Sequence, residues 1–264
     1  LIAQYAGFLM GIALWMHNYG RLKRLWEIKN YKLKIKGGEE AGIWEKGVML
    51  RFFQVNRDIF LRTLCLVAVT LFFTSAGASQ GEIILAVNTL LMQLFTLFSY
   101  VMDGFAYAGE ALSGRYIGAR NREAFTDTVR HLFGWGAVMA VLFTLVYALG
   151  GNAFLGLLTD DKEVIAVADT YFYWALAVPA VGIAAFIWDG IFIGATATRG
   201  MLLSMAAAAV SFFILYYGLH PVLANHALWL AFLTYLLMRG VVQTGLSREV
   251  IRRAFPSKKE PAWR

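Results

Sequence analysis

The chain has 264 residues, of which 59% are hydrophobic and 16% are charged, whereas soluble globular domains average about 45–50% apolar and about 25% charged residues. This composition excludes a water-soluble globular protein of this size and predicts an integral membrane protein. A formal net charge of +7 is also found in nucleic-acid-binding proteins, but the distribution of the basic residues, described below, argues against that function. Cys65 is the only cysteine, so the chain can form neither an intrachain disulfide nor a cysteine metal cluster.

Seven apolar stretches approach or exceed the length of about 20 residues that a membrane-spanning helix needs. In chain order they are 1–16, 60–78, 83–110, 132–150, 164–196, 201–218 and 228–246. The first is short and opens on Leu1 without a preceding basic segment, so we expect that its beginning is missing and that it is not a signal peptide. The polar stretch 17–57 is the one clear linker.

Basic residues are concentrated in every second connection along this series of spans. The linker 17–57 contains ten Lys or Arg, and in total 23 of the 24 basic residues fall on one side of the predicted membrane, with Lys162 alone on the other. The positive-inside rule therefore predicts that the linker and the C-terminus are cytoplasmic. Because the basic residues follow the topology and do not gather on one element, we do not expect nucleic-acid binding.

An aspartate interrupts the fifth stretch, in the segment AAFIWDGIFIGATATRGM at 184–201. Asp189 lies about 7 Å inward of the middle of this span at 1.5 Å per residue. A charged side chain at the centre of a membrane helix costs about 2.5–3.5 kcal/mol on insertion scales, so such residues usually bind protons, ions or cationic substrates. The alternative is an aspartate that is hydrogen-bonded to a neighbouring helix.

Two features of the same span accompany Asp189. Pro179 removes one helix hydrogen bond and predicts a kink, which is found both at transporter binding sites and in ordinary packing. Gly190 and Gly194 form a small-xxx-small pair that favours a close contact with another helix.

The third stretch ends in YVMDGFAYAGEALSGRYIGAR, which carries two more acids. Asp103 and Glu110 are seven residues apart and therefore share one helix face. They either line a vestibule for cations or protons, or pair at the interface with the arginines that follow them, Arg115, Arg120 and Arg122.

Several polar and aromatic residues are further candidates for contacts with a substrate. Asn88 and Gln93 lie higher in the third span, and hydrogen bonds between helices explain them equally well. Tyr107 and Trp188 flank the candidate acids, where aromatic rings suit lipophilic cations, although helix packing is the commoner reason for such rings.

The segments DGFAYAGEALSGRYIGARN and WDGIFIGATATRGM resemble the multidrug and toxic compound extrusion (MATE) family, in the branch of DNA-damage-inducible protein F (DinF). This resemblance implies an all-α membrane protein: residues 1–16 as the end of helix six, 17–57 as a cytoplasmic basic linker between lobes, 58–246 as the six-helix C-terminal lobe of a twelve-helix transporter, and 247–264 as a cytoplasmic tail. It also implies a location in the bacterial inner membrane.

The family resemblance implies a secondary antiporter that exports organic cations, drugs or other toxic compounds in exchange for H⁺ or Na⁺. Asp189 then corresponds to an acid implicated in cation binding in some branches, with Asp103 and Glu110 in the motif of the eighth helix. The Na⁺-binding branch has a glutamate in its seventh helix, but the stretch 60–78 contains no carboxylate, which favours H⁺. We expect no cofactor or metal, and we expect transport to need the missing N-terminal lobe.

Three other functions remain as alternatives. A lipid-linked oligosaccharide flippase of the same superfamily needs inward-facing basic residues, whereas the spans show acids and no mid-membrane Arg or Lys. An intramembrane enzyme is disfavoured because the sequence lacks HExxH, GxSxG and paired histidines on one helix. A structural membrane subunit without transport activity is the third.

Overall fold

The computed structural model of the chain describes residues 46–256. The predicted span 1–16, most of the linker 17–57 and the last part of the predicted tail lie outside the described residues. The chain divides into two units between Phe52 and Phe53, and the packing described below is that of the second unit.

The described residues form six long helices joined by short links, and they contain no strand. The helices are α2 (Lys46–Ala78), α3 (Glu82–Gly118), α4 (Arg122–Leu158), α5 (Lys162–Gly194), α6 (Thr198–Leu223) and α7 (Asn225–Ala254). All six are long and apolar enough to cross a membrane. This result confirms the predicted all-α membrane fold.

Each helix begins before the apolar stretch that predicted it, and four of the six (α3, α4, α6 and α7) also end after it. The region 111–131, which separates two predicted spans, is helical except for 119–121, and α7 continues to Ala254, inside the predicted tail. The links are short because single residues turn the chain sharply: Arg120, Thr196 and Ala224 have φ angles of 52°, 53° and 44°. Asn121 then caps α4 by accepting a hydrogen bond from the backbone N–H of Ala124 at 3.0 Å.

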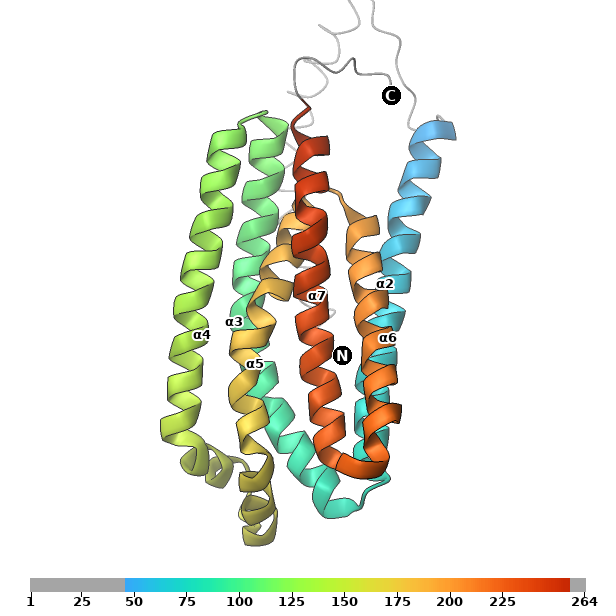
Figure 1. The fold of residues 1–264 in the computed structure, drawn as a ribbon. Coiled ribbons are helices and arrows are strands. Elements are labelled where there is room, and N and C mark those ends of the chain that lie inside the picture. Colours follow the sequence, from blue (N-terminus) through green and yellow to red (C-terminus); the bar gives the residue numbers. More distant parts are fainter. Residues whose placement is uncertain (1–45, 257–264) are drawn as a thin grey trace, which may run out of the picture. The chain divides into compact units, whose positions relative to one another are not determined.

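The helices lie side by side, and successive links alternate between the two ends of the bundle (Figure 1). One end, here called the basic end, holds the α3–α4 and α5–α6 links and the end of α7. Its basic residues include Arg115, Arg120, Arg122, Arg199, Arg252 and Arg253. The opposite end holds the links before α3, α5 and α7.

The α5 helix is the centre of the bundle, and glycines allow neighbouring backbones to approach it. A Cβ atom on Gly190 would lie 2.0 Å from the carbonyl oxygen of Ala106, and one on Gly194 would lie 2.4 Å from that of Glu110, both on α3. On the other side, a Cβ atom on Gly240 of α7 would lie 2.9 Å from the Cβ of Ala184. The close helix contact predicted for Gly190 and Gly194 is therefore confirmed. Pro179 is buried inside α5, which continues through it.

The α2 helix joins the bundle through aromatic side chains. The ring of Phe72 lies edge-on to those of Phe212 and Tyr216 of α6, with centroids 5.9 and 5.0 Å away. The ring of Phe73 lies 5.2 Å from that of Trp229 of α7. Because such pairs are directional and add about 0.5–1.5 kcal/mol each, they fix this part of α2 against α6 and α7.

Candidate functional site

The carboxylate of Asp189 is the centre of a charged cluster between α2, α5 and α7. Arg239 of α7 donates a hydrogen bond to Oδ2 at 2.6 Å, and Arg62 of α2 donates to the same oxygen. Gln243, one turn beyond Arg239, donates to Oδ1 at 2.5 Å. Both carboxylate oxygens of Asp189 therefore have partners on other helices.

The two arginines that contact Asp189 are held differently. The side chain of Arg239 is 7% exposed, whereas that of Arg62 is 22% exposed. The guanidinium carbon of Arg239 lies 5.9 Å from the ring centroid of Phe186 and 5.6 Å from that of Tyr235, within the range of cation–π attraction. Arg239 is thus enclosed by packing, and Arg62 lies at the accessible edge of the cluster.

The cluster contains one carboxylate and two guanidinium groups. In addition, Nε of both arginines and Oε1 of Gln243 are buried and have no hydrogen-bond partner among the described residues. The expectation that the spans carry no mid-membrane Arg or Lys is therefore wrong. Arg62 is close to the start of the apolar stretch 60–78, whereas Arg239 lies near the middle of 228–246. Both side chains meet Asp189 inside the bundle.

The other two predicted acids are placed differently from each other. Asp103 on α3 is partly exposed and lies close enough to interact electrostatically with Asp189, Arg62 and Arg239. Glu110 is also partly exposed. Among the described residues, neither acid forms an ion pair with Arg115, Arg120 or Arg122. The structure thus brings Asp103 into the surroundings of Asp189.

The predicted polar residues of α3 have separate surroundings. Asn88 is buried, and its amide exchanges hydrogen bonds of 2.8 and 3.0 Å with Asn225 and accepts one of 2.8 Å from the indole N–H of Trp229. These contacts are the inter-helix bonds that the sequence offered as the alternative to substrate binding. Gln93 is exposed, and so is Tyr107, at 70%.

Trp188 adjoins Asp189 in the chain, but its side chain has its own partners. It is buried, and its indole N–H donates a hydrogen bond of 2.8 Å to the hydroxyl of Thr244 on α7. Its ring packs against that of Phe133, with centroids 5.3 Å apart. Trp188 therefore joins α5 to α4 and α7.

One buried acid was missed by the sequence analysis. Asp58 is 3% exposed and pairs with Arg57 at 3.1 Å, and the hydroxyl of Thr198 donates to it at 3.4 Å. It precedes the apolar stretch 60–78, whereas α2 begins at Lys46 and so includes it. Its position directly before an apolar stretch was the only sequence signal that could have indicated a buried acid here.

These observations define the class of protein: a multi-pass, all-helical membrane protein with a buried charged cluster inside its helix bundle. The family profile described as MatE matches residues 59–222, and the chain belongs to this family.

The chain is similar to DNA damage-inducible protein F of Escherichia coli (strain K12), with 39% identity over 91% of this chain and 50% of that protein. It is also similar to Protein DETOXIFICATION 45, chloroplastic, of Arabidopsis thaliana, with 26% identity over 50% of this chain and 24% of that protein. The chain therefore spans half or less of the length of these curated relatives.

Two solved structures share the fold. A crystal structure of a mutant of the Vibrio cholerae MATE transporter VcmN superposes with a TM-score of 0.67 at 22% identity, covering 79% of this chain and 48% of that one. A crystal structure of a MATE protein in the bent conformation gives a TM-score of 0.63 at 17% identity, covering 80% of this chain and 46% of that one.

Proposed function

We propose that this chain forms the C-terminal lobe of a secondary antiporter that exports organic cations and other toxic compounds in exchange for H⁺, with Asp189 in the cation pathway. The observation that carries the proposal is the Asp189 cluster, a buried carboxylate inside a membrane bundle that shares one oxygen between two arginines. Membership of the MatE family supports a transport function, and we propose no enzymatic activity.

The arrangement of ligands at Asp189 supports H⁺ over Na⁺ as the coupling ion. Oδ1 accepts from Gln243, and Oδ2 accepts from Arg62 and Arg239. A sodium ion needs several oxygen ligands and would have to displace these donors. A proton needs only one lone pair, and its arrival would remove the charge that holds Arg62. Asp103, which is nearby and partly exposed, is proposed as the second acid of this pathway.

Alternating exchange further requires a partner for the lobe. The chain covers about half of the relatives and solved structures named above. We propose that an N-terminal lobe supplies the other wall of the transport pathway, and that the linker 17–57 and the C-terminus are cytoplasmic in a bacterial inner membrane. Glu110, Tyr107 and Gln93, which are all at least partly exposed, remain candidates for contact with cargo.

The test is transport by the full-length parent protein in proteoliposomes. A proton gradient and then a sodium gradient are imposed, and efflux of a fluorescent cationic dye is followed for the wild type and for Asp189→Asn. The matched control is Asp169→Asn, since Asp169 is an exposed acid on the same helix. We expect the proton gradient to drive export, Asp189→Asn to abolish it, and the control to retain it. Normal export by folded Asp189→Asn protein would remove Asp189 from the pathway.

A lipid-linked oligosaccharide flippase is the second candidate, and one observation favours it. Two arginines contact the one carboxylate of Asp189 inside the lobe, so the cluster supplies guanidinium donors of the kind that bind an anionic pyrophosphate group. Flipping of a fluorescent lipid-linked pyrophosphate oligosaccharide by the same proteoliposomes, without dye export, would select this candidate. Failure of both assays in folded full-length protein would leave a structural subunit.

A further inference from the structure

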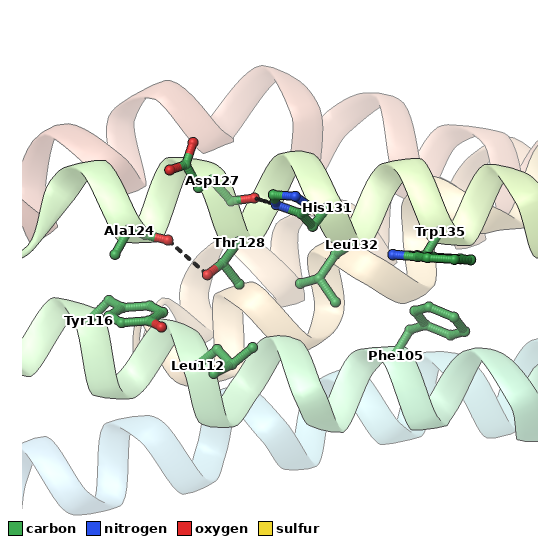
Figure 2. Close-up of a pocket in the computed structure, with 9 residues that line it drawn as sticks. All are labelled: Phe105, Leu112, Tyr116, Ala124, Asp127, Thr128, His131, Leu132 and Trp135. Atoms are coloured by element: carbon green, nitrogen blue, oxygen red, sulfur yellow. Dashed lines mark hydrogen bonds between the residues drawn. The ribbon is translucent and has the colours of Figure 1, made fainter.

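A groove with a volume of about 440 Å³ lies between α3 and α4, and Asp189 and its partners are not among the residues that line it. Figure 2 shows its lining: Leu112 and Tyr116 come from α3, and Thr128, His131 and Trp135 come from α4. Asp127 stands at its rim, and its carboxylate points to the opposite side of α4 from the hydroxyl of Thr128 (Figure 2). Trp135 is 62% exposed, and Asp127 and His131 are exposed as well, so the groove is accessible from outside the bundle.

The groove changes in chemistry along its length. Its polar residues, Tyr116, Asp127 and Thr128, lie near the turn where α3 ends and α4 begins. Trp135 lies about 12 Å further along α4 at 1.5 Å per residue, next to the apolar Phe105 and Leu132 (Figure 2). Both helices are candidate membrane spans. Phe105, Leu132 and Trp135 fall inside the apolar stretches 83–110 and 132–150, whereas the polar residues fall in 111–131. We therefore place the polar part of the groove at the depth of lipid head groups and the apolar part at the depth of the acyl chains.

The polar part offers hydrogen-bond acceptors. Nδ1 of His131 donates a hydrogen bond of 2.7 Å to the backbone carbonyl oxygen of Asp127, because a carbonyl only accepts. In the tautomer with its single proton on Nδ1, Nε2 is an acceptor. The hydroxyl of Thr128 donates to the carbonyl of Ala124 at 2.8 Å, which leaves its oxygen free to accept. Within residues 46–256 the carboxylate of Asp127 has no ion-pair partner. These groups together suit a ligand with several N–H donors and a positive charge.

A positive group lies beside the same groove. The guanidinium carbon of Arg115 is 5.9 Å from the ring centroid of Tyr116, which lines the groove. In the described part of the chain Arg115, like Asp127, has no ion-pair partner. A ligand that carries an ammonium and a phosphate a few atoms apart would complement Asp127 and Arg115 at once.

We propose that this groove binds a phospholipid with a primary ammonium head group, an ethanolamine phospholipid. Its ammonium is held at the rim by Asp127 and His131, its phosphate by Arg115, and its chains lie along Phe105 and Trp135. A choline lipid lacks the N–H donors that these acceptors require, and a glycerol phosphate lipid lacks the cation that Asp127 requires. The indole N–H of Trp135, deeper in the groove, matches the level of the ester carbonyls below a head group.

The test measures which lipid the full-length parent protein retains. The purified protein is equilibrated in mixed micelles with equal amounts of dioleoyl phosphatidylethanolamine, phosphatidylcholine and phosphatidylglycerol, and passed through a column. The lipids that remain bound are then counted by mass spectrometry. We expect the wild type to retain ethanolamine lipid several-fold over the other two. Asp127→Asn and Arg115→Gln should each reduce that preference at least about threefold.

Glu123→Gln and Arg130→Gln are the matched controls, because both side chains are exposed on α4 and neither lines the groove. They should retain the wild-type preference. Leu112→Trp, which fills the groove without changing charge, should lose the preference for ethanolamine lipid. Asp127→Glu, which keeps the carboxylate, should retain that preference. Equal retention of the three lipids by the wild type, a preference for phosphatidylglycerol, or wild-type retention by both Asp127→Asn and Leu112→Trp would each overturn the proposal. Displacement of the bound lipid by dodecylammonium at equimolar concentration would assign the groove to free amphipathic amines and overturn it as well.

Discussion

Replacing Gly190 with alanine should separate α5 from α3. A Cβ atom at this position would lie 2.0 Å from the carbonyl oxygen of Ala106 and 2.6 Å from its carbonyl carbon. These are backbone atoms of a continuous helix, so no side-chain rotation relieves the clash. Ordinary van der Waals contact begins at 3.4 Å, and the Cβ atom would lie at 2.0 Å. The two helix backbones must therefore move apart by about 1.4 Å.

The expected cost follows from two opposing effects. Overpacking a well-packed interface costs about 1–3 kcal/mol, and alanine in place of glycine in a helix contributes about 1 kcal/mol in the other direction. Because the clash involves backbone on both sides, we expect the upper part of the first range and a net loss of about 1–2 kcal/mol. A melting temperature lower by about 2–8 °C corresponds to this loss in a domain of this size.

The assay is thermal unfolding of the full-length parent in detergent, and the control comes from the same interface. A Cβ atom on Gly114 of α3 would lie 3.5 Å from the carbonyl oxygen of Gly194, which is ordinary contact. Gly114→Ala should therefore unfold at or above the wild-type temperature, whereas Gly190→Ala should unfold below it. Equal melting temperatures for the two variants would refute the argument that backbone contact at Gly190 positions α5.

Three further predictions concern the buried polar contacts and use the same thermal assay. Asn88→Ala should lower the free energy of unfolding by about 1–3 kcal/mol, because it leaves buried donors and acceptors on α7 unpaired. Gln93→Ala, at an exposed position of the same helix, should stay within about 0.5 kcal/mol of the wild type. Equal losses for the two variants would contradict this prediction. Asp189→Asn should lower the free energy of unfolding by about 3–5 kcal/mol, because it removes the carboxylate that both guanidinium groups contact. The double variant with Arg62→Gln should recover part of that loss. Strictly additive losses would show that the two residues are not coupled. Arg239→Gln should cost more than Arg62→Gln, because its side chain is 7% rather than 22% exposed, and the reverse order would contradict the proposed difference between them.

The membrane fold could be predicted from the sequence because apolar stretches report directly on burial in lipid. The ends of the helices could not be predicted in the same way. The stretch 111–131 contains arginines and a turn signal at Asn121, yet only 119–121 leave the helical conformation. Backbone hydrogen bonds continue a helix through polar residues beyond the lipid, so hydropathy marks the span and not the helix.

The candidate site was predicted in part. Asp189 stands out because it is the single charge in a long apolar segment. Its partners stand out less. Arg62 lies close to a predicted boundary, where a basic residue is common. Arg239 lies inside the predicted stretch 228–246, but the positive-inside argument counted it with the basic residues of the cytoplasmic side. They are 127 and 50 residues away from Asp189 in the chain, and only the packing of α2, α5 and α7 brings them together. The pairing of Asn88 with Asn225, 137 residues away, was inaccessible to sequence patterns for the same reason.

The geometry around Asp189 indicates where a change of charge would act. The α5 helix is fixed against α3 at Gly190 and Gly194, and against α7 at Gly240, so the carboxylate has little freedom to move. Arg239 is enclosed between aromatic rings and is fixed as well. Arg62 differs, since it is partly exposed and belongs to α2, which is joined to the bundle mainly by aromatic side chains. If a proton or a cargo cation neutralises Asp189, the contact with Arg62 is the one that can open without disturbing the core. On the proposed function, a change of charge at Asp189 would therefore be transmitted to the rest of the protein through α2. The unequal losses of unfolding free energy expected for Arg62→Gln and Arg239→Gln reflect the same difference between the two arginines.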